Sequence, residues 1–147
     1  MPREIHGVIA MLVTPFTKDY QLNEGALRAE VDWCVQQGAN GLVATPSIGE
    51  FLHLSEAERV QAFAVVLEQA RKHTDILTVA MTSGATTLEA LKFAKIAGEM
   101  GYDAQQLIHP ITGAVAKRKS TGTTGWWPRL GTCRWWFITT RHFPSSP

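Results

Sequence analysis

The chain has 147 residues, 45% of them hydrophobic and 18% charged, a composition that suits one compact domain and excludes a disordered polymer. Its net charge of +1 conceals an asymmetry, because all 13 acidic residues lie at or before Asp103 and only basic charges follow. No apolar run approaches the roughly 20 residues that cross a bilayer, and the first apolar stretch lacks the features of a signal peptide, so we expect a cytoplasmic protein that does not bind membranes.

Short apolar runs alternate with amphipathic stretches in the first two thirds of the chain. Each run has the length of a buried strand, and residues that end strands follow, such as Pro15 after the first run. The predicted strands are residues 7–13, 41–45, 76–81 and 104–108.

The first two segments between these strands predict helices with recognisable ends. Asn23 can cap a helix that ends at Gly38, a residue suited to the left-handed conformation. Ser55 and Glu58 form a capping-box pattern at the start of the second helix, in which each side chain would bond the other residue's backbone N–H. The apolar face expected on this second helix consists of Val60, Phe63, Ala64, Leu67 and Ala70.

A third helix is predicted between the third and fourth strands. Thr86 and Glu89 repeat the capping-box pattern at its start, and Gly101 ends it. The residues that we expect it to bury, to varying degrees, are Leu88, Leu91, Ala94 and Ile96.

Strand–helix–strand units of this length imply parallel strands joined by right-handed crossovers. Both a doubly wound sheet and a (β/α)8 barrel satisfy that pattern. The sequence has no Gly-x-Gly-x-x-Gly motif and no phosphate loop after the first strand, which argues against a nucleotide-binding sheet. The predicted fold class is therefore α/β, with the parallel strands forming the N-terminal half of a (β/α)8 barrel.

Several motifs in residues 7–108 resemble, in order and spacing, those of the dihydrodipicolinate synthase and N-acetylneuraminate lyase family. The matching motifs, in chain order, are LVTPF at 12–16, GLVATPSIGEF at 41–51, LSEAER at 54–59, SGATT at 83–87 and GYDA at 101–104. The resemblance implies a class I aldolase-type lyase that acts on a 2-keto acid such as pyruvate and uses no cofactor.

In that family the loop after the second strand holds the substrate carboxylate with backbone N–H groups and a hydroxyl. By position, Ser47 supplies the hydroxyl and Ile48 a backbone N–H. The residues expected to have structural roles near the site are Thr14, Gly49, Glu50 and Gly84. Ile48 replaces the threonine usual at its position, which argues against dihydrodipicolinate synthase itself and leaves the substrate open among relatives that cleave or dehydrate sugar-derived keto acids.

The resemblance also implies which catalytic residues are missing. The family uses a Schiff-base lysine on the sixth strand and a proton-shuttling tyrosine on the fifth, and the chain has neither, so we expect no catalytic residue in it. Its histidines and its two cysteines, Cys34 and Cys133, have no metal-ligand spacing, so no metal site is expected. Intact relatives are homo-oligomers by the same resemblance.

Residues 110–147 do not continue the family pattern, because apolar periodicity stops and four of the five tryptophans occur as two pairs. Tryptophan has a single codon, so the paired tryptophans fix part of the underlying nucleotide sequence. That sequence can be translated in another reading frame. Residues 132–143 are then compatible with Asp-Val-Pro-Leu-Val-Val-Tyr-Asn-Asn-Pro-Ala, in which the fourth position allows Leu or Val and the seventh Tyr or His. This string resembles the family's fifth strand with its tyrosine. We interpret residues 1–109 as a partial barrel domain and 110–147 as an irregular, out-of-frame tail that follows a one-base frameshift near residues 109–111.

Two functional hypotheses follow. The first is the front half of a keto-acid lyase that is inactive as written, because a complete barrel takes roughly 250 residues. The second is a non-enzymatic half-barrel that binds a partner or nucleic acid through its basic, tryptophan-rich tail. The frameshift accounts for more features of the tail, so nucleic acid is not the expected partner.

Overall fold

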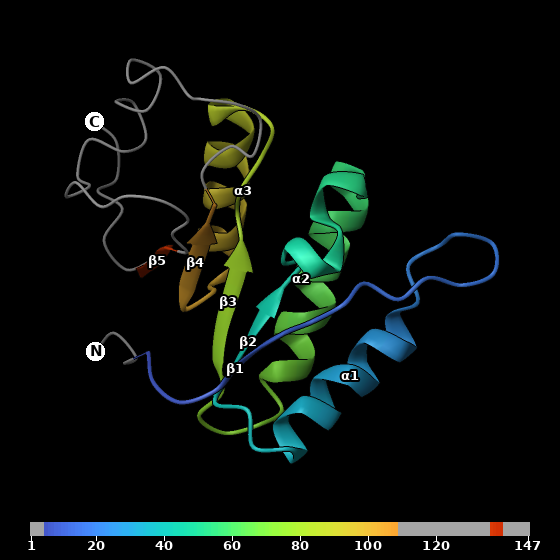
Figure 1. Cartoon of the computed structure of the whole chain (residues 1–147), viewed down its shortest axis with the longest axis vertical. Coiled ribbons are helices and arrows are strands. Elements are labelled where there is room, and N and C mark those ends of the chain that lie inside the picture. The colour runs from blue at the N-terminus through green and yellow to red at the C-terminus, as the bar shows by residue number, and fades with distance from the viewer. Residues whose placement is uncertain (1–4, 109–135, 140–147) are drawn as a thin grey trace.

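The structure, a computed structural model, describes residues 5–108 and 136–139. Within these ranges, parallel strands and helices alternate along the chain (Figure 1). The parallel strands are β1 (Ile9–Met11), β2 (Gly41–Ala44), β3 (Leu77–Met81) and β4 (Ala104–Leu107). The helices are α1 (Glu24–Gln36), α2 (Glu56–Ala70) and α3 (Thr87–Met100).

The strands lie side by side in the order of the sequence, β1-β2-β3-β4. Each neighbouring pair is parallel, with Val43 of β2 beside Met11 of β1 and Val79 of β3. The three complete strand–helix units and the fourth strand that the sequence predicts are therefore confirmed. Because the strands are parallel, the loops that follow them meet at one edge of the sheet, which we call the carboxyl edge.

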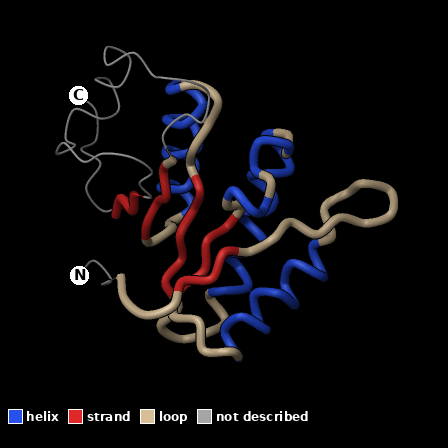
Figure 2. Tube along the Cα trace, viewed as in Figure 1, coloured by secondary structure: helices blue, strands red, loops and turns tan. Residues whose placement is uncertain are grey.

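The main core lies between the helices and one face of the sheet, as Figure 2 shows by the helices gathered beside and behind the strands. Phe63 of α2 is completely buried there, with its ring edge-on to those of Phe93 and Tyr102. The opposite face, which we call the inner face, carries a second cluster of buried residues from β2, β3 and β4: Val43, Leu77, Val79, Met81 and Ala104, with Phe51.

The helix ends agree with the sequence signals at most positions. The Asn23 side chain accepts a hydrogen bond from the backbone N–H of Ala26, and the capping box of Ser55 and Glu58 is complete. Gly38 and Gly101 both adopt positive φ, at +89° and +87°. These sites are set by local chemistry, which explains why the sequence alone predicts them.

The second capping box is only half formed, so this prediction was wrong in part. Thr86 accepts a hydrogen bond from the N–H of Glu89, as expected. The Glu89 carboxylate, however, accepts from the N–H of Ala85 at 2.8 Å and not from that of Thr86. The loop before α3 turns back over Glu89, which brings the Ala85 N–H closer to the carboxylate.

The buried face of α3 also differs from the predicted one. Leu88 is 79% exposed and Leu91 is 44% exposed, whereas Ala90, Phe93 and Ala97 are buried. The two alanines let the helix approach the sheet closely, and Phe93 fills the space beside Phe63.

One further strand departs from the expectation of an irregular tail. Residues Trp136–Thr139 form β5, which pairs antiparallel with β4 and places Ile138 beside Gln105. The outer edge of β4 would otherwise present unpaired N–H and C=O groups, and an added strand satisfies them. The other residues of the tail lie outside the described part of the chain. No helix among the described residues is long and apolar enough to span a membrane.

Helices α1 and α2 are joined at their surface by a polar cluster around Asp32. Its carboxylate accepts hydrogen bonds from Nε2 of Gln69, at 2.7 and 2.8 Å to its two oxygens, and from Nε2 of His73 at 2.7 Å. The bond from Gln69 first, and then that from His73, lowers the pKa of Asp32 below its usual value.

We expect the Asp32→Asn variant to be less stable than the parent chain at about pH 6, and the difference to close as the pH falls to about 2. A carboxylate whose pKa is lowered in the folded state stabilises that state above its ordinary pKa, and this contribution is lost on protonation. Urea unfolding across this pH range measures the effect. Asp19→Asn, in the exposed loop after β1, is the matched control, and a difference that stays constant with pH would contradict the prediction.

Candidate functional site

The loop after β2 begins and turns at residues with a left-handed backbone. Thr45 directly follows β2 with φ +45°, and Glu50 has φ +58°. A 3-10 turn, η1 (Ser47–Gly49), lies between them, and a second, η2 (Phe51–His53), follows. A β-branched residue such as threonine rarely adopts this conformation, so the loop holds local strain of a kind that clusters at functional sites.

The two residues predicted to bind the substrate carboxylate open the η1 turn. The N–H groups of Gly49 and Glu50 donate to Pro46 and Ser47, at 2.9 and 3.1 Å. By contrast, the N–H groups of Ser47 and Ile48 have no acceptor among the described residues, and the Ser47 hydroxyl has no partner there either. Ser47 is half-buried, and the Ile48 side chain is 58% exposed. Adjacent unpaired N–H groups beside a hydroxyl make an arrangement that can bind a carboxylate.

Thr14 and Gly49 hold this loop against the end of β1. The Thr14 hydroxyl donates to the carbonyl of Gly49 at 2.7 Å. A Cβ at Gly49 would lie 2.8 Å from the carbonyl oxygen of Leu12 and 3.0 Å from Cδ of Pro46. Position 49 therefore accepts only glycine without a shift of the backbone, and the hydrogen bond from Thr14 holds this end of the turn against the residues that follow β1.

We expect Gly49→Ala to destabilise the chain by about 1–3 kcal/mol, because the added methyl meets backbone that cannot give way. Gly98→Ala in α3 is the matched control, since a Cβ there would lie 3.9 Å from Nε2 of Gln105, an ordinary van der Waals distance. Removing a glycine from a helix interior should stabilise the chain by about 0.5–1 kcal/mol. Urea denaturation of both variants measures whether the free energy of unfolding falls for Gly49→Ala and rises for Gly98→Ala. An equal change at the two positions would contradict the steric role of Gly49 in the loop.

Gly84 lies in the loop after β3, at the same carboxyl edge. A Cβ at this position would lie 2.8 Å from Cβ and Cγ of Glu89. The absence of a side chain at Gly84 therefore lets Glu89 approach and accept the hydrogen bond from Ala85. This contact fixes the loop at the start of α3, beside the loop that follows β2.

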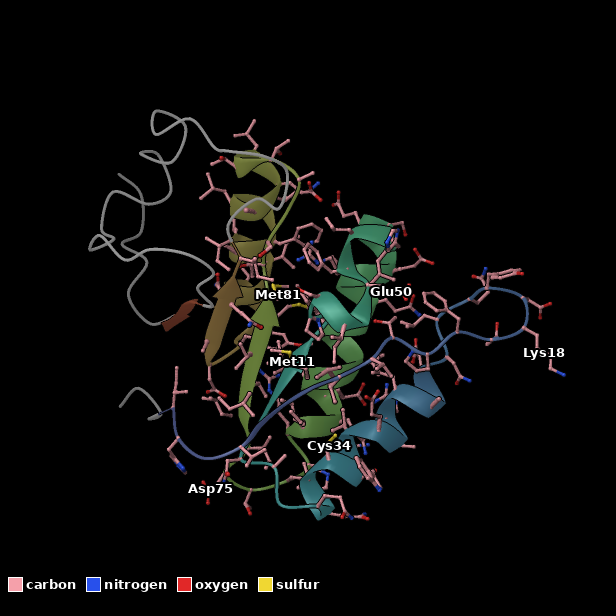
Figure 3. The ribbon with its side chains drawn as sticks, viewed as in Figure 1. Met11, Lys18, Cys34, Glu50, Asp75 and Met81 are labelled. Carbon is pink, nitrogen blue, oxygen red and sulfur yellow. The ribbon has the colours of Figure 1, made fainter. Side chains whose placement is uncertain are left out.

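Glu50 contributes to the site through its backbone. Its left-handed conformation joins the η1 and η2 turns, while its side chain is exposed and has no hydrogen-bond partner among the described residues. Figure 3 shows Glu50 near the end of the sheet at which Met81 lies, with Asp75 at the opposite end.

Arg59 is a residue of the site region whose burial the sequence analysis did not predict. It is 1% exposed, its guanidinium lies 3.8 Å from the ring centre of Phe93 and 4.9 Å from that of Phe51, and Nη2 donates to the carbonyl of Met81. Burial lowers its pKa to about 10. Arg59 thus ties α2 to the end of β3 and to the η2 turn.

Two buried polar side chains of the sheet were also missed. Thr45 is 3% exposed and Gln106 is fully buried, and neither side chain has a hydrogen-bond partner among the residues that the structure describes. A signal for Gln106 was present, because Gln105 and Gln106 interrupt an otherwise apolar predicted strand.

Sequence comparisons with known proteins all point to one family. The profile of the dihydrodipicolinate synthetase family matches residues 4–119. A 4-hydroxy-tetrahydrodipicolinate synthase from Acidiphilium cryptum is 33% identical over 105 residues, which are 71% of this chain and 35% of that protein. An N-acetylneuraminate lyase from Enterobacter sp. is 34% identical over 111 residues, which are 76% of this chain and 37% of that protein. The chain therefore spans little more than a third of the length of these relatives.

Solved structures similar to this chain come from the same family. A dihydrodipicolinate synthase from Acinetobacter baumannii complexed with pyruvate has a TM-score of 0.72 and 32% identity, with 78% of this chain and 39% of that one covered. An N-acetylneuraminate lyase from Mycoplasma synoviae has a TM-score of 0.72 and 29% identity, with 79% and 40% covered. The predicted α/β fold, with parallel strands from the first half of a (β/α)8 barrel, is confirmed. The chain belongs to the dihydrodipicolinate synthetase family.

Proposed function

We propose that this chain carries the carboxylate-binding half of a pyruvate-type, class I aldolase-like lyase, and that it binds a 2-keto acid without turning it over. The observation that carries the proposal is the η1 turn, where the N–H groups of Ser47 and Ile48 and the Ser47 hydroxyl lack partners among the described residues. The relative from Acinetobacter baumannii, whose structure contains pyruvate, supports a keto acid as the ligand class.

In this proposal the loop residues bind and orient the substrate. The backbone N–H groups and the hydroxyl hold the carboxylate, while Thr14 and Gly49 keep the loop in place through the 2.7 Å hydrogen bond between them. Hydrogen bonds to a charged group in a partly buried site are stronger than those between neutral groups. The bound acid would have its keto carbon toward the inside of the barrel.

The chemical step of this lyase class needs a lysine amine that condenses with the keto carbon and releases water to form a Schiff base. The lysines that follow α3 are Lys117 and Lys119, both in the segment that we propose to be out of frame. The family profile matches up to residue 119, about ten positions into that segment. The proposed frameshift is therefore supported by the codons of the tail and not by the end of the profile match.

The experiment that tests the proposal combines ligand binding with borohydride trapping. We expect the chain to bind pyruvate reversibly and to give no covalent adduct on reduction, whereas the product of the frame-restored gene should give one adduct for each chain. A stoichiometric adduct on the chain as written would contradict the proposed inactivity. The absence of any pyruvate binding would contradict the carboxylate site.

Ser47→Ala should weaken pyruvate binding by about tenfold, because the variant loses one hydrogen bond to a charged group. Thr74→Ala is the matched control, since it removes an exposed hydroxyl beside Asp75, at the opposite end of the sheet. Calorimetric titration with pyruvate gives both affinities. Equal weakening by the two variants would show that the effect does not come from the loop.

The second hypothesis, binding of a partner or nucleic acid through the tail, has no described residue to support it. The basic residues of the tail, and three of its four tryptophans, lie outside the described ranges. We therefore make no proposal from it.

A further inference from the structure

Two buried side chains at the carboxyl end of the sheet have hydrogen-bonding groups without partners in the described part of the chain. Gln106 of β4 is 0% exposed, and neither its amide nitrogen nor its amide oxygen has a partner among residues 5–108 and 136–139. Thr45, which directly follows β2, is 3% exposed, and its hydroxyl oxygen has no partner in these ranges either. Buried polar groups are almost always paired, so each such exception requires an explanation, and a ligand outside the chain is one.

The strand register places these two residues in one row across the sheet. Gln106 of β4 pairs with Met81 of β3. Ala44 of β2 pairs with Ala80, so Thr45, the next residue, is level with Met81. The row therefore runs across β2, β3 and β4, immediately before the loops that contain Ser47 and Gly84.

The Gln106 side chain projects from the inner face of the sheet. Its neighbour Gln105 points toward the helices, where Nε2 donates to the carbonyl of Ala94 in α3 at 2.9 Å. Successive side chains of a strand point to opposite faces, so Gln106 points to the inner face, as does its partner Met81. This is the face on which the proposed keto acid would extend from the carboxylate site.

The chemistry of a primary amide restricts which ligand group can satisfy it. The nitrogen donates and the oxygen accepts, so the complementary group must both accept and donate. A carboxylate or a keto oxygen only accepts and would leave the amide oxygen unpaired. A hydroxyl group fulfils both requirements, and the threonine hydroxyl can bond it as donor or as acceptor.

The position of the row also indicates the size of the ligand. Strands β2 and β4 are separated by two strand spacings, roughly 10 Å. A carboxylate held after β2 and a hydroxyl bound from β4 therefore belong to an acid longer than pyruvate.

We propose that Gln106, together with Thr45, is a specificity-determining pair that binds a hydroxyl group on the chain of a hydroxylated 2-keto acid. This inference rests on the proposed function, since the carboxylate of the same acid is held by Ser47 and Ile48. The pair acts on recognition and takes no part in bond breaking.

The test compares two acids that differ by one hydroxyl group, 4-hydroxy-2-oxobutanoate and 2-oxobutanoate, by calorimetric titration of the full chain. We expect the full chain to bind the hydroxylated acid about tenfold more tightly. In Gln106→Leu this preference should disappear, while the affinity for 2-oxobutanoate stays within about twofold. Removing an unpaired buried amide should also raise the thermal midpoint of this variant, so a failure to fold is not expected.

Gln105→Leu is the matched control, because it removes an amide that faces the helices and should leave the preference intact. Side-chain amide signals in ¹⁵N–¹H spectra give a second readout: those of Gln106, identified by their loss in Gln106→Leu, should shift with the hydroxylated acid only. Equal binding of both acids, or a preference that survives in Gln106→Leu, would overturn the inference and leave the proposed function standing. If neither acid binds, the proposed function fails and the inference fails with it.

Discussion

Phe63→Ala should destabilise the chain by about 3–5 kcal/mol, a large part of the stability of a domain of this size. The Phe63 ring is completely buried, and its centre lies 5.6 Å from that of Tyr102 and 6.3 Å from that of Phe93. The substitution removes the buried ring and leaves a cavity between α2, α3 and the sheet, which the neighbouring rings can fill only in part.

Urea denaturation monitored by circular dichroism measures this effect. Phe63→Leu should cost about 1–1.5 kcal/mol, since it keeps most of the apolar volume. Leu88→Ala in α3 should leave the midpoint nearly unchanged, because the Leu88 side chain is 79% exposed. A loss at Leu88 as large as that at Phe63 would show that α3 buries the face predicted from the sequence and not the face seen in the structure.

The sequence predicts the elements whose signals are local. Asn23, the Ser55–Glu58 pair and Gly101 mark helix ends through hydrogen bonds or backbone conformations that involve only neighbouring residues. The parallel order of the strands follows equally from the lengths of the connections.

Features that depend on packing between distant segments were not predicted. The buried face of α3 is determined by Phe93, which meets Phe63 from another helix, and periodicity alone favoured Leu88 and Leu91. Ala64 was expected in the core of α2 and is exposed, while Val66 is buried in its place. One residue's shift in phase is enough to exchange such neighbours on a helix.

The candidate site also contains residues that sequence motifs identify and residues that only the packing of the fold identifies. Motif position alone singled out Ser47, Thr14 and Gly49 as candidates, and in the structure the Thr14 hydroxyl donates to the carbonyl of Gly49 in the turn that Ser47 begins. The sequence shows Gln106 only as a polar residue in an otherwise apolar strand, and its burial without a partner among the described residues is what singles it out. The family resemblance gave no reason to single it out, because it marks the residues that relatives share and not those by which this chain could select its own substrate.

Arg59→Ala should cost about 2–4 kcal/mol, whereas Arg59→Met should change stability by no more than about 1 kcal/mol in either direction. The arginine fills a space between Phe51 and Phe93 and is 1% exposed, so alanine would leave a cavity there. Methionine fills much of the same space and removes a charge whose burial is unfavourable, as the lowered pKa of about 10 for Arg59 indicates.

The comparison of the two variants separates packing from charge. Methionine cannot donate to the Met81 carbonyl, so it loses the hydrogen bond that Arg59 makes to the end of β3. If that bond and the contacts of the cation with the aromatic rings dominate, methionine will destabilise the chain as much as alanine does. Arg28→Ala, which removes a half-buried arginine paired at the surface with the exposed Glu68 at 2.9 Å, should change the urea midpoint much less. If Arg59→Met is stable but binds pyruvate less tightly than the parent chain, Arg59 is a positioning residue that holds the carboxyl edge of the sheet for the substrate.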